Sequence, residues 1–337
     1  MRVWEIQERF GLDALATVDR AEPEPGPGQV VVRVRAASLN YRDLLTVEGA
    51  YNPRQPLPLI PLSDGAGEVA AVGSGVTRVK EGDRVVGNFA QKWISGTPSR
   101  ERLRTSLGGP LDGMAAERVL LDAEGVVAIP EHLSFEEAAC LPCAAVTAWN
   151  ALVAQGNLTA GDTVLVLGTG GVALFALQLA RLLGGRVIVT SSSDAKLERA
   201  KALGATDVVN YDTTPSWDEA VKTMTNGQGV DNVLELGGAG TLARSLRAVR
   251  FGGQVSLIGN LSGLDAQLNL AHVFMRGVRL QGILVGNRDM FEAMNRAITL
   301  HRMRPVIDRT FDFDDLPAAL EHLKGRGHFG KIVLRVA

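Results

Sequence analysis

The glycine-rich turn at residues 168–171, GTGG, is the stretch whose residue types and spacing most directly suggest chemistry. It follows the continuous apolar run 164–167, which is typical of a strand buried on both faces of a parallel sheet. Gly168 would let the chain turn off that strand, Gly170 would let backbone approach a pyrophosphate, and the small Ala173 would let the next helix pack closely. The pattern predicts a phosphate-binding turn at a helix N-terminus, where free N–H groups and the helix dipole attract anions.

The surrounding sequence supports this interpretation, because GxGxxA alone is a weak signal in a chain with 38 glycines. Strand and helix patterns alternate over residues 144–285, and this alternation predicts a six-stranded doubly wound parallel sheet, the Rossmann type of α/β fold. Strands are expected at 164–167, 186–190, 207–210, 231–235, 253–258 and 278–284, and helices at 171–183, 194–203, 216–224 and 239–249.

The first 130 residues have a different pattern, with short valine-rich segments between regular turns. Such spacing predicts a compact β-barrel. Residues 91–113 are polar and arginine-rich, and they are expected to form a long surface loop. The tail, with helices expected at 290–301 and 315–324 and a strand at 331–336, would return to the barrel. We therefore expect one domain from 1–143 with 286–337, and a second domain from 144–285.

Composition excludes several classes of protein. The 337 residues have a formal net charge of −2 with both signs interspersed, so no nucleic-acid surface or membrane-binding surface is expected. The N-terminus lacks the apolar segment of a signal peptide, and a cytoplasmic protein is expected. Cys140 and Cys143 form a CxxC that could be a redox pair, but small buried residues are favoured because no strand precedes the motif and Pro142 interrupts it.

Seven motifs occur in an order and spacing that resemble the medium-chain dehydrogenase/reductase superfamily. They are SLNYRD (38–43), PLIPLSDGAGEVAAVGSGV (58–76), EGDRV (81–85), LPCAAVTAW (141–149), GTGGVA (168–173), KALGATDVVNY (201–211) and GHFGK (327–331). The resemblance covers essentially the whole chain. It implies a GroES-like barrel beside the Rossmann domain, a substrate site between them, and a homodimer formed through the last Rossmann strand, at about 278–284.

The chain departs from the zinc-dependent branch of that superfamily. The positions of the catalytic zinc ligands carry Asn40, Ser63 followed by Asp64, and Cys143, whereas a catalytic zinc needs three protein ligands. Residues 91–113, where the structural zinc loop would fall, contain no cysteine. No metal is expected at either place.

The resemblance is therefore to the zinc-free quinone oxidoreductase and enone reductase branch. Without a Lewis acid an alkoxide is hard to stabilise, but hydride can still pass from a reduced nicotinamide to a quinone or an α,β-unsaturated carbonyl compound. The expected partner is thus a small carbonyl or quinone substrate. Two alternatives stay open: an alcohol dehydrogenase acting on alcohols or aldehydes, and a non-catalytic NADPH-binding sensor or structural protein.

NADPH is the expected cofactor. NAD-binding relatives place an acidic residue at the end of the second strand, and here that position falls at about Ser191. Serine hydroxyls and the Lys196 ammonium would accept a 2′-phosphate that a carboxylate would repel. Tyr211 stands where zinc-free relatives place a tyrosine, and Asp194 is interpreted as the N-cap of the helix that begins at Ala195.

The resemblance assigns the remaining site residues by position. Asn40 and Tyr51 are the candidate catalytic residues, as a hydrogen-bond donor and a donor or proton relay. Tyr41 and Trp93 are candidate substrate contacts. The candidate cofactor contacts are Thr147, Gly168, Thr169, Gly170, Gly171, Val172, Ser191, Ser192, Lys196, Tyr211, Gly237, Ile258, Gly259, Leu284, Val285 and Gly286, with Phe329, Gly330 and Lys331 closing over the cofactor from the barrel side.

Overall fold

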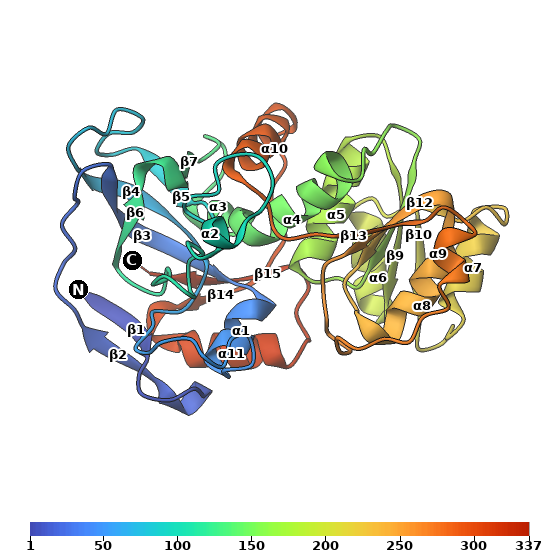
Figure 1. Cartoon of the computed structure of the whole chain (residues 1–337), viewed down its shortest axis with the longest axis horizontal. Helices are drawn as coiled ribbons and strands as arrows, with labels where there is room; N and C mark the ends of the chain where they lie inside the picture. Colours follow the sequence, from blue (N-terminus) through green and yellow to red (C-terminus); the bar gives the residue numbers. More distant parts are fainter. Residues whose placement is uncertain (337) are drawn as a thin grey trace. The chain divides into compact units, whose positions relative to one another are not determined.

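The computed structural model describes residues 1–336, which form two compact units (Figure 1). The first unit contains Met1–Val146 and the segment that begins at Gly286, and the second contains Thr147–Val285. The chain enters the second unit three residues after the predicted boundary and leaves it where the sequence places the exit. No helix within residues 1–336 combines the length and apolar character that crossing a membrane requires.

The second unit is built on a six-stranded sheet with the order β10-β9-β8-β11-β12-β13, in which every neighbouring pair is parallel. This is the doubly wound order. The chain adds β9 and β10 on one side of β8 and then β11, β12 and β13 on the other side. The predicted Rossmann sheet is confirmed. Its strands are β8 (Thr163–Leu167), β9 (Arg186–Ser191), β10 (Asp207–Asn210), β11 (Val230–Glu235), β12 (Val249–Leu257) and β13 (Arg279–Gly282).

Helices connect these strands because a parallel pair needs a long crossover. They are α5 (Gly171–Leu182), α6 (Asp194–Ala202), α7 (Trp217–Met224), α8 (Ala239–Ala248) and the short α9 (Ala271–Phe274). The residue that caps α6 is Ser193, whose side chain accepts from the Lys196 N–H. The prediction that Asp194 is the N-cap is therefore wrong: Asp194 is the first helical residue, and the serine hydroxyl already binds the free N–H group.

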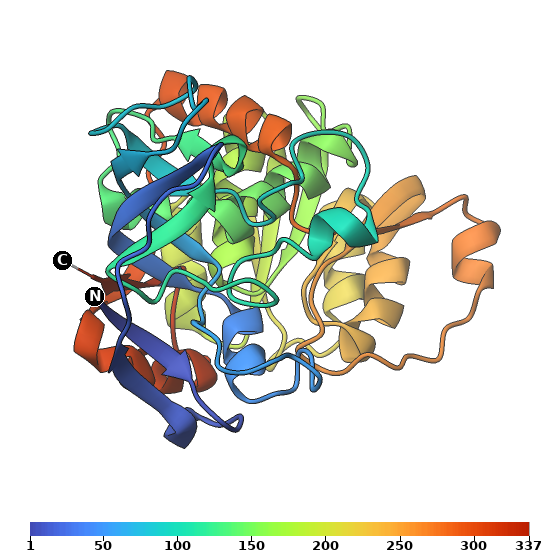
Figure 2. The same cartoon turned by 60° about the vertical axis from the view of Figure 1, so that its left-hand side comes forward.

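The first unit contains a seven-stranded sheet in which the long strand β3 pairs with β4, β6 and β15. Its strands are β3 (Gln29–Leu39), β4 (Asp64–Val72), β5 (Arg84–Gly87), β6 (Arg118–Asp122), β7 (Val126–Ala128), β14 (Ile307–Asp312) and β15 (Lys331–Arg335). The strands β1 (Arg2–Ile6) and β2 (Leu15–Asp19), dark blue in Figure 2, form a separate two-stranded ribbon. Strands β14 and β15 both come from the tail, although only the second of them was predicted.

The helices of the first unit come from both of its chain segments. They are α1 (Tyr41–Val47), α2 (Arg100–Leu103), α3 (Phe135–Ala139), α10 (Arg288–His301) and α11 (Leu316–Lys324). After α3 the chain continues through a π-helical segment, Leu141–Ala145, into α4 (Val146–Trp149), and a second π-helical segment covers Asn150–Ala154. Short π-helical segments are frequent at functional sites, because they redirect side chains within a helix.

The segment 91–113 differs from the expected surface loop. Trp93 and Leu107 are buried, and α2 lies within the segment. Backbone hydrogen bonds tie it to the unit, from Leu107 N to Phe89 O and from Arg288 N to Trp93 O. The polar composition of the segment gave no sign of these anchors, because they are only two large apolar side chains.

Candidate functional site

The glycine-rich turn of the second unit has the geometry that the sequence predicts. Gly168 adopts φ +85°, a conformation that side chains disfavour, and its N–H donates to Thr190 O at 2.8 Å. A Cβ on Gly168 would meet nothing within 4 Å, so the backbone conformation requires glycine and the space beside it is open. Gly170 precedes α5, and Ala173 is buried against the sheet. The turn can therefore present the first N–H groups of α5 to a phosphate.

The end of β9 brings together two of the predicted cofactor residues. Ser191 is buried at the strand end, and its carbonyl accepts from the N–H of the exposed Tyr211 at 3.1 Å. The carboxylate of Asp194 accepts from Asn210 Nδ2 at 2.7 Å. The first acidic side chain after the strand is thus engaged by a neighbouring amide, and a serine occupies the position of the usual ribose-binding acid.

The exit of the chain from the second unit contains a strained residue. Val285 adopts φ +31°, which is costly for a β-branched side chain. Its carbonyl accepts from Asn150 Nδ2 at 2.8 Å, and Asn150 is the first residue of the second π-helical segment. Thr147 is buried one turn earlier. Sequence reasoning identified Val285 but missed Asn150, because nothing in its sequence neighbourhood distinguishes it from an ordinary helical residue.

In the first unit, Asn40 lies between β3 and α1, and its side-chain amide is held at both ends. The buried Lys331 ammonium donates to Asn40 Oδ1 and to Leu39 O, at 2.7 Å each. Asn40 Nδ2 donates to Ser63 Oγ at 3.2 Å. Because an ammonium group can only donate, Lys331 fixes the amide oxygen on its own side and turns the N–H groups of Asn40 away from itself.

The same network continues to Asp64, which follows Ser63 in the chain and, like Ser63, is fully buried. Asp64 accepts from Ser63 Oγ at 2.9 Å and from Cys143 N at 3.1 Å, and its carboxylate lies 3.9 Å from Lys331 Nζ. Burial raises the pKa of Asp64, and the Lys331 charge opposes that rise. We call Asn40, Ser63, Asp64 and Lys331 the lysine network.

The donor set at these positions does not fit a catalytic zinc. An amide, a hydroxyl and one cysteine replace the expected thiolates and imidazole, and the carboxylate already has an ammonium beside it. Within residues 1–336, no three His, Cys, Asp or Glu side chains gather closely enough to hold a metal ion. The neighbouring Cys140 is buried, and burial raises the pKa of its thiol to about 12, which suits a structural thiol.

A second buried cluster lies on α1 directly after Asn40. The Asp43 carboxylate accepts from Asn40 N at 2.8 Å, from Ser63 N at 3.2 Å and from the Arg42 guanidinium at 3.2 Å. Burial raises the pKa of Asp43 to about 6, against the Arg42 charge that lowers it. The same guanidinium lies 4.8 Å from the ring centroid of Tyr51. Arg42 and Asp43 belong to a motif that the sequence identified, but their burial became evident only in the structure.

The remaining predicted residues of the first unit have different surroundings. Tyr51 is half exposed, and Tyr41 lies beside Arg326. Trp93 is only 1% exposed and donates to Gly96 O at 3.0 Å. The expectation that its ring contacts substrate is therefore corrected: Trp93 anchors its loop.

The predicted closing contacts from the tail also need correction. Phe329 is buried, and its N–H donates to Asp308 at 2.9 Å. Lys331 is buried in the lysine network. Neither side chain reaches the surface to close over a cofactor, because both fill the interior of the first unit. Gly330, between them, adopts φ +98°.

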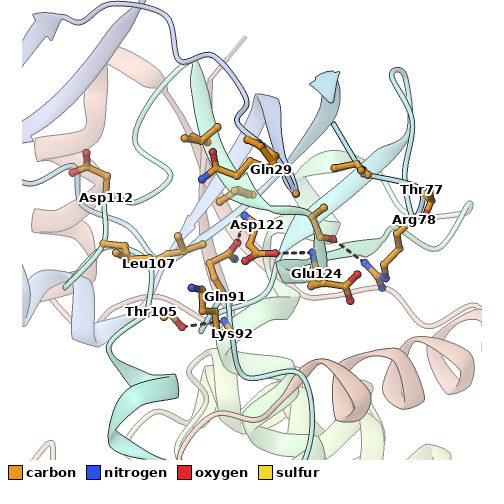
Figure 3. Close-up of a pocket in the computed structure, with 18 residues that line it drawn as sticks. Gln29, Thr77, Arg78, Gln91, Lys92, Thr105, Leu107, Asp112, Asp122 and Glu124 are labelled. Carbon is orange, nitrogen blue, oxygen red and sulfur yellow. Dashed lines mark hydrogen bonds between the residues drawn. The ribbon is translucent and has the colours of Figure 1, made fainter. Parts of the chain in front are cut away.

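A cavity of about 610 Å³ opens in the first unit beside β6 (Figure 3). Polar groups on its wall bind one another: Asp122 N donates to Gln91 at 3.1 Å, and Lys92 N donates to Thr105 at 3.0 Å. Its lining includes none of the predicted site residues. We assign it no part in the site.

Two family models match successive parts of the chain. The alcohol dehydrogenase GroES-like domain matches residues 26–131, and the zinc-binding dehydrogenase model matches residues 171–299. A zinc-type alcohol dehydrogenase-like protein of Schizosaccharomyces pombe is 43% identical, over 98% of this chain and 97% of its own length. Acryloyl-coenzyme A reductase of Metallosphaera sedula is 30% identical, over 93% of this chain and 94% of its own length.

Solved structures agree with this assignment. A Sinorhizobium meliloti 1021 protein assigned to the alcohol dehydrogenases superposes with a TM-score of 0.92 and 41% identity, over 99% of this chain and 98% of its own. An NAD-dependent alcohol dehydrogenase gives a TM-score of 0.92 and 36% identity over the full length of both chains. A mycobacterial protein complexed with NADPH gives a TM-score of 0.84 and 28% identity, also over the full length of both chains.

The two folds, the glycine-rich turn and these relatives define a pyridine nucleotide-dependent type of oxidoreductase. The chain belongs to the medium-chain dehydrogenase/reductase superfamily, and the predicted resemblance is confirmed. It is an oxidoreductase similar both to alcohol dehydrogenases and to an acryloyl-coenzyme A reductase.

Proposed function

We propose that this protein is an NADPH-dependent, zinc-independent oxidoreductase that delivers hydride to quinones or α,β-unsaturated carbonyl compounds. The observation that carries the proposal is the lysine network. Where a zinc-dependent relative needs thiolate and imidazole ligands, this chain has an amide, a hydroxyl and a carboxylate joined to a buried ammonium.

This site offers hydrogen-bond donors to a substrate oxygen. A conjugated acceptor suits such donors, because the charge that develops after hydride transfer is spread along the conjugated system. Asn40, oriented by Lys331, is the proposed donor to the carbonyl oxygen, and the half-exposed Tyr51 is the proposed donor or proton relay. The bound nicotinamide would supply the hydride.

The end of β9 supports the choice of NADPH. Ser191 replaces the acidic ribose ligand, and Asn210 engages the carboxylate of Asp194. Lys196 lies on the first turn of α6, where a cation complements a 2′-phosphate. The glycine turn fits the pyrophosphate, since the space beside Gly168 is open.

The test is the rate at which chelator-treated protein oxidises NADPH, and separately NADH, with a simple quinone and a simple enone. We expect turnover that is faster with NADPH and unchanged by metal removal. Activity on an alcohol that requires added zinc would instead support the alcohol dehydrogenase alternative, which the names of the relatives favour. Tight NADPH binding without turnover would support a non-catalytic role.

The cofactor preference can be tested by itself. Ser191→Asp should reverse the preference for NADPH over NADH, because the new carboxylate repels the 2′-phosphate and accepts from a ribose hydroxyl. Ser191→Ala is the matched control, since it removes the hydroxyl without adding charge, and it should keep the preference. Equal preferences in the two variants would contradict the assignment of this position.

A further inference from the structure

A carboxylate with no assigned role is buried at the end of β11 in the second unit. The side chain of Glu235 is fully buried. Its Oε1 accepts from Gly237 N at 2.8 Å, from Gly238 N at 3.0 Å and from Thr241 Oγ1 at 2.5 Å, while Oε2 accepts from Ser245 Oγ. All four donors are uncharged groups of the turn after β11 and of α8.

The backbone carbonyl of the same residue holds a second turn. It accepts from Ile258 N at 3.0 Å and from Gly259 N at 3.1 Å, at the end of the neighbouring strand β12. The two turns are also packed tightly, because a Cβ on Gly259 would lie 2.2 Å from Leu236 O. Glu235 therefore joins the turns that follow β11 and β12 through four backbone hydrogen bonds, and it accepts two more from hydroxyl groups of α8.

One of these turns has a conformation that needs support. Gly238 adopts φ +89° and ψ −141°, a combination open to glycine and otherwise rarely populated. Glycine gains conformational freedom when such a turn is released, so hydrogen bonds to its backbone help to keep the turn ordered. Burying a carboxylate is costly unless its oxygens are fully hydrogen bonded, and here the turn supplies two of those bonds.

The strand order assigns both turns to one half of the dinucleotide site. A doubly wound sheet binds one mononucleotide on each side of its first strand, here β8. Ser191, at the end of β9, lies on the half that receives the adenosine ribose. The turns after β11 and β12 lie on the other half, which receives the nicotinamide mononucleotide.

We propose that Glu235 is a positioning residue that holds the two backbone turns on which the nicotinamide half of the cofactor rests. This inference rests on the proposed nicotinamide-dependent function. It predicts a selective effect: loss of the carboxylate should weaken binding of the whole cofactor while leaving binding of its adenosine half unchanged.

The test compares Glu235→Gln with Asp218→Asn. Glutamine keeps the size of the side chain but removes its charge and one acceptor oxygen. Asp218 is the matched control, because it is a buried carboxylate of the same unit that accepts from Arg247 on α8 at 2.7 Å and contacts neither turn. Calorimetry would measure the Kd for NADPH and for adenosine 2′,5′-bisphosphate, and turnover would be measured with a quinone.

We expect Glu235→Gln to weaken NADPH binding about tenfold and to lower kcat, with an unchanged Kd for the bisphosphate. Asp218→Asn should leave both Kd values unchanged. An unchanged Kd for NADPH in Glu235→Gln, or equal losses for both ligands, would overturn the positioning role. If Glu235→Gln does not fold, Thr241→Val removes one donor only and should show the same selective effect to a smaller degree.

Failure of the proposed function would look different. In that case the wild-type protein itself would bind neither NADPH nor NADH, and the inference would fall with it. Wild-type binding together with unaltered binding by Glu235→Gln would leave the proposed function intact and reject the role of Glu235 alone.

Discussion

Lys331 is the residue on which the orientation of Asn40 depends. Its ammonium is the only charged donor that we find on Asn40 Oδ1 within residues 1–336, and it is buried. Replacing Lys331 by methionine would keep the unbranched apolar part of the side chain but leave Asn40 Oδ1 and Leu39 O without this donor. The amide of Asn40 could then rotate, and it would present its oxygen where the substrate needs an N–H group.

We therefore expect Lys331→Met to lower the free energy of unfolding by about 2 kcal/mol, the usual value of hydrogen bonds from a charged group. It should also lower kcat about tenfold, which is less than the loss on removing an oxyanion donor outright. Urea unfolding and steady-state kinetics would measure both. Arg335→Met, an exposed change on the same strand, is the control and should alter neither. Equal kcat values in the two variants would contradict the role of Lys331.

Asp43 is one of two buried carboxyl groups, with Asp64, whose raised pKa values make the stability of the protein depend on pH. Burial raises the pKa of Asp43 from 3.8 to about 6, so the folded state binds its proton more tightly than the unfolded state does. This group therefore contributes stability that is fully present below about pH 4 and is lost as the pH rises through about 6. The difference between the pKa values of Asp43 in the folded and unfolded states corresponds to about 3 kcal/mol of stability.

Asp43→Asn should remove this slope, whatever its effect at any single pH. The free energy of unfolding of the wild type minus that of the variant should fall by up to about 3 kcal/mol between pH 4 and pH 7. Urea unfolding at several pH values within that range would measure it. A difference that stays constant with pH would show that Asp43 has the same pKa in both states.

At the scale of elements, the turn between β8 and α5 allows the cost of backbone strain to be measured separately from cofactor binding. Gly168 and Gly161 lie at opposite ends of β8, adopt φ +85° and +95°, and both have open space where a Cβ would be. An alanine at either position should therefore cost about the same, roughly 1–2 kcal/mol, because the strain is that of a left-handed backbone.

Gly168→Ala and Gly161→Ala should consequently unfold at similar urea concentrations. Only Gly168→Ala should also raise the Kd for NADPH, because the methyl group would occupy the open space proposed for the pyrophosphate. Fluorescence titration with NADPH would compare them. Similar cofactor affinities in the two variants would remove the turn from the binding site.

The same elements show what the sequence could and could not predict. The buried strands of the second unit were recognisable because a strand covered on both faces must be continuously apolar, as in β8. The anchoring of Trp93 was not predictable, since its partners Gly96 and Arg288 come from a turn and a distant helix. Glu235 and Asn150 were missed for a related reason. A polar residue at the end of an element has many uses, and only its partners in the folded chain distinguish them.

At the scale of the whole molecule, the Rossmann sheet has two edge strands within residues 1–336, β10 and β13, and the family resemblance leads us to expect a dimer through β13. Strand β13 pairs with β12 on one side only. Beside it in the chain, Phe274 and Met275 are about 70% exposed, and Phe251 on β12 is 68% exposed. Exposed aromatic and methionine side chains next to an open strand edge are typical of a protein interface, since a free edge otherwise favours uncontrolled association.

We propose that two copies pair through β13 about a two-fold axis, with these three side chains covered in the dimer. Light scattering should then give twice the mass of one chain for the wild type. The double variant Phe274→Asp, Met275→Asp should give a folded monomer, because it places four charges in the buried interface without touching the core. Leu300→Asp, at a 78% exposed position on α10, is the control and should stay dimeric. A wild-type monomer, or a double variant that stays dimeric, would show that this edge is not the interface.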